Sequence, residues 1–192
     1  LVLCFIGAAL NSYGSDNQNK PNYLFKEKIS RTILENYLAR SATVASLLHL
    51  TLDDDLRMMQ NTGVKFAGRV IWMWGGESKI NDLIHKGTPF VRRIHQMDPD
   101  IILQGAIFEI ITTDVNNVPI PAAVFKEFGL TPENRNFNYK KMIYPYGHRV
   151  NHWYENASVP DMSRTETKMW FLYVAKRWID MGLEAIHFGQ VE

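Results

Sequence analysis

This chain of 192 residues has a single cysteine, no apolar run long enough to span a membrane, and no large excess of one charge. Cys4 is the single cysteine, so no disulfide can form within the chain. The apolar run at residues 1–10 is too short to span a bilayer, and no later segment is apolar enough. The 21 Lys and Arg residues are balanced by 20 Asp and Glu residues. Because no basic patch stands out, we expect no nucleic-acid partner. Because no segment is long and apolar enough, we also expect no membrane span.

The chain also lacks the short motifs of several enzyme classes. Neither G-x-G-x-x-G nor G-x-x-x-x-G-K-[ST] occurs, which argues against a nucleotide bound on an open sheet. There is no H-E-x-x-H, and His49, His85 and His95 do not have metal-ligand spacing. A G-x-S-x-G nucleophile elbow is absent as well. We therefore expect a function that uses no metal and no cofactor.

The N-terminal segment has the pattern of an export signal. An apolar run over residues 1–10 is followed by Ser12, Tyr13 and Gly14 and then by the polar residues 15–21. This pattern predicts a signal peptide over residues 1–14 that lacks its initiating methionine and basic region. A buried first strand is the alternative, and Cys4 would fit a lipoprotein box only poorly. We expect an exported bacterial protein (periplasmic, cell-surface or extracellular) in which residues 15–35 lead into a domain over residues 36–192.

Beyond residue 35, strand-like segments alternate with segments of helical periodicity. Strands are predicted over residues 36–40, 65–74, 101–111 and 185–192, the first within a stretch that also has helical character. Helices are predicted over residues 52–61, 80–97, 121–128 and 163–178, with a break near Gly87 and Pro89 and a stop at Gly182. The irregular segment 134–161 is longer than an ordinary connection, which is typical of functional loops.

This alternation predicts an α/β fold with a parallel sheet covered by helices. A doubly wound sheet and a (β/α)8 barrel both satisfy the pattern, and the missing phosphate loops favour the barrel. A barrel usually needs about 250 residues, whereas four strands are predicted here. We therefore expect a TIM-type parallel (β/α) barrel of which this chain is the N-terminal half, with about four βα units.

Two glutamates end neighbouring predicted strands, Glu109 the third and Glu192 the fourth. Carboxyl ends of parallel barrel strands face one cleft, and a pair of carboxyl groups is what glycosidic bond cleavage requires. The alternative is that these acids simply reach solvent or cap the next helix. If Glu192 faces the barrel interior, Gln190 and Phe188 face it too and His187 faces outward. This alternation favours Glu192 as the catalytic residue and makes Gln190 a substrate-binding neighbour.

Aromatic residues provide candidate sugar contacts, because their rings stack on the C–H faces of sugars. Trp72 and Trp74 lie on one face at the end of the second predicted strand, unless they are core residues beneath a loop. His152 and Trp153 lie in the long irregular segment and are plausible substrate contacts. Arg40, after the first predicted strand, could bind a substrate hydroxyl or carboxylate, although a salt bridge is the alternative.

With these residues, the chain over 36–192 resembles glycoside-hydrolase-like (β/α)8 barrel proteins exported by gut and soil bacteria. The segments that carry the resemblance are residues 37–40, 108–109, 160–166 and 184–192. In the large clan of retaining barrel glycosidases, the acid/base glutamate ends the fourth strand and the nucleophile ends the seventh. The resemblance thus implies an acid/base role for Glu192. Val191 stands where that clan commonly has asparagine.

The hypothesis that follows is an exported glycoside hydrolase acting on a polysaccharide or oligosaccharide. Glu192 would be the general acid/base, with Glu109 as its carboxylate partner or as a substrate-binding residue. One alternative is a non-catalytic carbohydrate-binding barrel at the cell surface, with Trp72, Trp74 and Trp153 as its platforms. A second is a barrel enzyme of another class, such as a lyase or isomerase.

Overall fold

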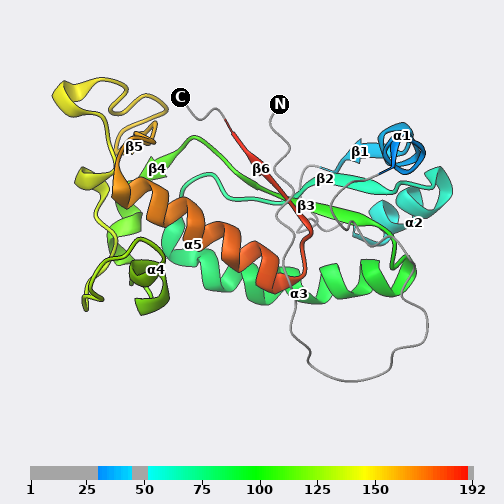
Figure 1. Cartoon of the computed structure of the whole chain (residues 1–192). Helices are drawn as coiled ribbons and strands as arrows, with labels where there is room; N and C mark the ends of the chain where they lie inside the picture. The colour runs from blue at the N-terminus through cyan, green and yellow to red at the C-terminus, as the bar shows by residue number, and fades with distance from the viewer. Residues whose placement is uncertain (1–29, 45–51, 190–192) are drawn as a thin grey trace.

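The structure, a computed structural model, describes residues 30–44 and 52–189 and has an α/β fold. Its main sheet has four parallel strands in the order β1-β2-β3-β6, so each strand pairs with the next parallel strand along the chain (Figure 1). The strands are β1 (Ser41–Thr43), β2 (Phe66–Ile71), β3 (Ile102–Ile107) and β6 (Ala185–Phe188). The predicted strands over 65–74 and 101–111 are confirmed, as is the described part of 185–192.

Three helices cover one face of this sheet. They are α2 (Leu52–Thr62), α3 (Ile80–Met97) and α5 (Thr165–Met181), and each joins one parallel strand to the next. Helices α3 and α5 lie side by side beneath the strands (Figure 1), and Leu56 and Met59 of α2 belong to the same hydrophobic core. Successive crossovers of one hand place their helices on one face of a sheet, which explains this arrangement.

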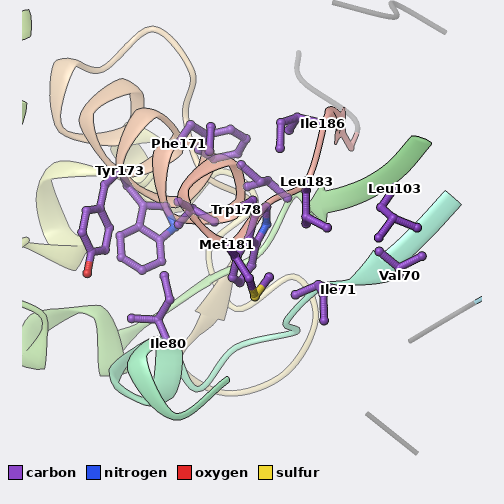
Figure 2. Packing of buried hydrophobic residues seen from close by; sticks show 14 of the residues in the cluster. Val70, Ile71, Ile80, Leu103, Phe171, Tyr173, Trp178, Met181, Leu183 and Ile186 are labelled. Carbon is purple, nitrogen blue, oxygen red and sulfur yellow. The ribbon is translucent and has the colours of Figure 1, made fainter. Parts of the chain in front are cut away.

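Trp178 of α5 stands at the centre of this helix-covered core. Its side chain is fully buried, and its indole N–H donates a hydrogen bond of 3.2 Å to the carbonyl oxygen of Ala106. Gly105 of β3 makes room for the ring, because an added Cβ would lie 2.7 Å from it. Figure 2 shows Trp178 and Met181 of α5 among the strand and helix side chains of this core. The last turn of α5 ends at Gly182 with φ at 108°, which confirms the predicted stop.

The opposite face of the sheet is covered at its amino-terminal end by α1 (Arg31–Ala39), on the far side from α3 and α5 (Figure 1). Tyr37 packs there against Ile102 and Ala185, and its hydroxyl donates to the carbonyl oxygen of Asp100 at 2.8 Å. The prediction of a strand over residues 36–40 is therefore wrong. Residues 36–39 form the end of α1, because Ser30 caps the helix and Tyr37 anchors it to the sheet.

The predicted break near Gly87 and Pro89 is also wrong, because α3 runs through both residues. Gly87 instead lets the side chains of Ile71 and Met181 pack closely against α3, because an added Cβ would lie 3.0 Å from each of them. The burial of α3 residues such as Val91 against the core favours a continuous helix despite the proline.

A long connection between β3 and α5 forms a lobe beside the carboxyl ends of the strands. It contains the antiparallel pair β4 (Ile111–Thr112) and β5 (Ala157–Ser158) and the helix α4 (Ala122–Glu127). Residues 134–161 are mostly irregular, as predicted, and the predicted helices over 52–61, 121–128 and 163–178 are confirmed. Arg135 binds the buried Glu166 of α5 through two hydrogen bonds of 2.6 and 2.9 Å, which ties the lobe to the core.

The predicted signal peptide, Gln190 and Glu192 lie outside the described residues. None of the helices over residues 30–44 and 52–189 combines the length and the apolar character that crossing a membrane requires.

Candidate functional site

Aromatic rings gather at the carboxyl ends of β2, β3 and β6. Phe108, directly after β3, is at their centre, with its ring centroid 5.6 Å from that of Trp72 and 5.7 Å from that of Trp74. On the other side, the centroid of the His187 ring lies at 6.1 Å. Trp72 and Trp74 lie just beyond β2, and both contact Phe108. We call the rings of these four residues, together with Trp153, the aromatic cluster.

Trp153 reaches the cluster from the long connection. Its ring centroid lies 4.9 Å from that of Trp74, and its indole N–H donates a hydrogen bond of 3.0 Å to the carbonyl oxygen of Glu109. His152 packs beside it with a centroid separation of 4.7 Å. The exposed fractions are 39% for Trp74 and 37% for Trp153, so neither is a core residue. Solvent-accessible indole surface at the end of a parallel sheet is available to stack on a ligand.

A β-bulge brings an arginine to the same cluster. Between the paired residues Ala67↔Leu103 and Ile71↔Gly105, β2 advances four positions while β3 advances two. Arg69 lies within this bulge with φ at 58°, and its guanidinium carbon is 5.7 Å from the centroid of the Phe108 ring. This left-handed conformation costs an L-residue about 1–2 kcal/mol. Bulges commonly re-aim side chains next to active sites.

His187 faces the cluster, so the predicted alternation along the last strand is wrong. The register pairs Ala106 with His187, so His187 lies on the same face of the sheet as Phe108. Phe188 lies on the other, helix-covered face, where it stacks on Phe171 of α5. Partial burial lowers the pKa of His187 below its usual value, the positive charge of Arg69 lowers it further, and Glu109 acts in the opposite direction.

Glu109 lies at the bend after β3, and its carboxylate rests against Gly189 at the end of β6. A Cβ added to Gly189 would collide with Oε2 of Glu109, so the glycine makes room for the carboxylate. The N–H of Gly189 donates to the carbonyl oxygen of Ile107 at 2.8 Å, which holds the two strand ends together. Glu109 therefore leans toward β6, whereas Arg69 approaches Phe108 from β2.

Arg40 is not brought to this site. It follows α1 and precedes β1, so it lies at the amino-terminal edge of the sheet, where its side chain donates to Asn36. Its backbone carbonyl accepts from Lys65 and Phe66 at the start of β2. The predicted position of Arg40 at a strand's carboxyl end is therefore wrong, because the first strand begins one residue after it.

A second carboxyl group, on Glu77, is buried on the helix-covered side. It accepts hydrogen bonds from the backbone N–H of Thr112 at 2.7 Å and from the Thr112 hydroxyl, which ties the turn after β2 to β4. Burial raises the pKa of Glu77, and Asp114 adds to the increase while the hydrogen bonds oppose it. The adjoining cavity measures about 10 Å³, which holds about one water. Glu77 therefore secures a loop and has no room beside it for a sugar.

The structure thus unites five of the predicted residues: Trp72, Trp74, Glu109, His152 and Trp153. Arg69, Phe108 and His187, which join them, were not among the predicted residues. A glycine and a charged residue inside an apolar strand, as in Gly68-Arg69, are a known signal of a bulge. That signal could have identified Arg69.

Across the described ranges, no three His, Cys, Asp or Glu side chains form a group that could hold a metal ion. In comparisons with protein-family models, curated protein sequences and solved structures, nothing matches this chain.

Proposed function

We propose that the four parallel strands are the first half of a TIM-type (β/α)8 barrel. Three observations support this: the strands follow chain order across the sheet, the connecting helices cover one face, and α1 covers the amino-terminal end of the other face. In a barrel the second face lines the interior, and chemistry takes place at the carboxyl ends of the strands. The aromatic cluster occupies that position.

The function that this geometry supports best is glycoside hydrolysis by an exported protein. The observation that carries the proposal is the partly exposed pair Trp74 and Trp153, bonded through the Trp153 indole to the backbone of Glu109, whose carboxylate lies at the neighbouring end of β6. Indole rings stack on the apolar faces of sugars, and a carboxyl group next to such a platform can act on the glycosidic bond. Trp72 supports the platform through Phe108, and His152 borders it.

Hydrolysis needs one carboxyl group that protonates the leaving oxygen and a second carboxylate that attacks the anomeric carbon or activates water. We assign proton transfer to Glu192 from the resemblance to barrel glycosidases, whose acid/base glutamate ends the fourth strand, and no longer from strand alternation, because Phe188 lies on the helix-covered face. We assign the partner or substrate-binding role to Glu109, and hydrogen bonding to the substrate to Gln190. A separation of about 5–5.5 Å between the two catalytic carboxyl groups gives retention of configuration, and about 6.5–9.5 Å gives inversion.

The test is an assay of the complete gene product on a panel of oligosaccharides, with sugar release measured by chromatography. Glu192→Gln and Glu109→Gln each remove a carboxyl group while preserving shape. We expect Glu192→Gln to lower turnover by about 10²–10⁴-fold, as for loss of an acid/base group. Glu155→Gln, at an exposed position of the long connection, is the matched control. Undiminished turnover in Glu192→Gln would contradict its assigned role.

A second candidate, a non-catalytic carbohydrate-binding barrel, is favoured by the same exposed rings, which need no catalytic pair in order to bind. It predicts that the wild-type protein binds glycans without cleaving them and that Glu192→Gln binds equally well. In either case Trp74→Ala should weaken glycan binding, because truncating a central tryptophan commonly costs tenfold or more, or about 1.4 kcal/mol. Calorimetric titration measures this change.

A further inference from the structure

Arg69 differs from the other residues of the site, because the backbone is distorted where it stands. The bulge in β2 interrupts regular pairing between Ala67 and Ile71, and Arg69 adopts a φ of 58° within it. A glycine would adopt this conformation without penalty, whereas in an arginine the Cβ crowds the backbone and strains it. Such strain persists where the surroundings enforce it, and it concentrates at binding and catalytic sites.

The charge of Arg69 has no acidic partner among the residues that the structure describes. Its side chain is exposed, and the contact it makes is with the face of Phe108. Glu109, the carboxylate that ends β3, leans away toward Gly189 of β6. A guanidinium held over an aromatic ring keeps its N–H groups available, because a cation–π contact uses none of them.

The neighbouring His187 does not supply a second positive charge beside Phe108. Burial and the charge of Arg69 both lower the pKa of His187, so the imidazole is neutral near pH 7. Arg69 is then the positive group on this side of Phe108. Trp74 contacts the same phenylalanine ring, with 5.7 Å between the ring centroids, so a sugar stacked on Trp74 that extends across Phe108 would bring its substituents to Arg69.

From this arrangement, we infer that the site takes a sugar carrying an anionic group, a uronate carboxylate or a sulfate ester, with Arg69 as its partner. The inference rests on the proposed carbohydrate function and narrows its substrate class. The planar guanidinium fork matches carboxylate and sulfate oxygens through two parallel hydrogen bonds, whereas a lysine offers a single point charge.

The experiment compares dissociation constants for matched oligosaccharides that are neutral, oxidised to the uronate at C6, or sulfated at C6, measured by calorimetry on the complete gene product. The variants are Arg69→Gly, which removes the side chain and relieves the strained φ, and Arg69→Lys, which keeps the charge. Arg149→Gly is the matched control, because Arg149 also has a positive φ, of 55°, and also lies over an aromatic ring, that of Tyr144.

We expect the wild-type protein to prefer an anionic oligosaccharide over its neutral counterpart by about tenfold or more, as for a hydrogen-bonded charge pair. Arg69→Gly should abolish this preference, Arg69→Lys should retain part of it, and Arg149→Gly should keep it. The uronate and sulfate arms identify which anion is preferred.

Binding to neutral sugars without any anionic preference, or a preference that survives Arg69→Gly, would overturn the inference and leave the proposed function standing. Absence of binding to every glycan would overturn both. Unfolding curves of each variant separate these outcomes from misfolding, since Arg69→Gly is expected to be at least as stable as the wild type.

Discussion

The two faces of the sheet are built from the same strands but carry different kinds of side chain. Toward α3 and α5, residues such as Leu103 are fully buried, and Gly105 gives its space to Trp178. On the opposite face, β3 carries Gln104 and is followed by Phe108, beside an arginine and a histidine. Because side chains alternate along a strand, one face can be optimised for packing while the other is left for recognition.

The two kinds of tryptophan show the same contrast. Trp178 is fully buried and its N–H bonds to the sheet, whereas Trp74 has 39% of its surface exposed in contact with other rings. The first contributes to stability in proportion to the apolar area it buries. The second leaves part of its surface to solvent, which is a cost unless a ligand covers it.

The strongest test of this contrast is Trp178→Ala. We expect the free energy of unfolding to fall by about 3–5 kcal/mol, because a large cavity opens on the helix-covered face. Urea titration followed by circular dichroism measures the change. A loss below about 1 kcal/mol would show that the two faces do not differ as described.

A smaller effect is expected from an added methyl group. In Gly105→Ala the new Cβ would lie 2.7 Å from Trp178 and 2.8 Å from Leu183, and such overpacking costs about 1–3 kcal/mol. Gly68→Ala is the control on the opposite face, where the nearest atom is the flexible Gln104 amide at 3.3 Å. Equal destabilisation of the two variants, measured by urea titration, would contradict the contrast between the faces.

The buried carboxyl group of Glu77 should make stability depend on pH. Since burial raises its pKa in the folded state, the folded protein holds this proton to a higher pH than the unfolded chain. Its contribution to stability is therefore full below the unfolded pKa near 4.5 and falls as pH rises through the raised folded value. Glu77→Gln, which cannot ionise, should gain stability relative to the wild type as pH rises above 4.5.

Urea titrations at several pH values check this prediction, with Glu155→Gln as the exposed control. A stability difference between wild type and Glu77→Gln that stays constant with pH would contradict the assignment.

The smallest effect on folding is expected from Trp74→Ala, in the aromatic cluster. We expect less than about 1 kcal/mol of change in the free energy of unfolding, because the side chain is partly exposed. The same variant should still lose glycan binding. A large drop in melting temperature would place Trp74 in the structural core instead.

Periodicity predicted most of the elements because the strands are apolar and the helices end at glycines such as Gly63, Gly129 and Gly182. It was wrong over residues 36–40, where the apolar Tyr37 anchors a helix to the sheet. It was also wrong at Pro89, because tertiary packing holds α3 together.

The site was predictable where its residues end strands, as Trp74 and Glu109 do. It was not predictable where backbone irregularity intervenes. Arg69 reaches the cluster through a bulge, and the face of His187 depends on the register between β3 and β6. The bulge has a local signal in Gly68-Arg69, but which ring it brings Arg69 to, and which face His187 takes, depend on strand pairing, which local sequence does not encode.

The bulge in β2 also has an evolutionary consequence. Its surplus over β3 is two residues, four positions against two, and a strand repeats its facing every two residues. Such an insertion can be gained or lost without moving Trp72 and Trp74 to the other face, whereas a single-residue insertion would reverse both. A two-codon deletion at the bulge would therefore remove Arg69 while the rest of the sheet stays in phase.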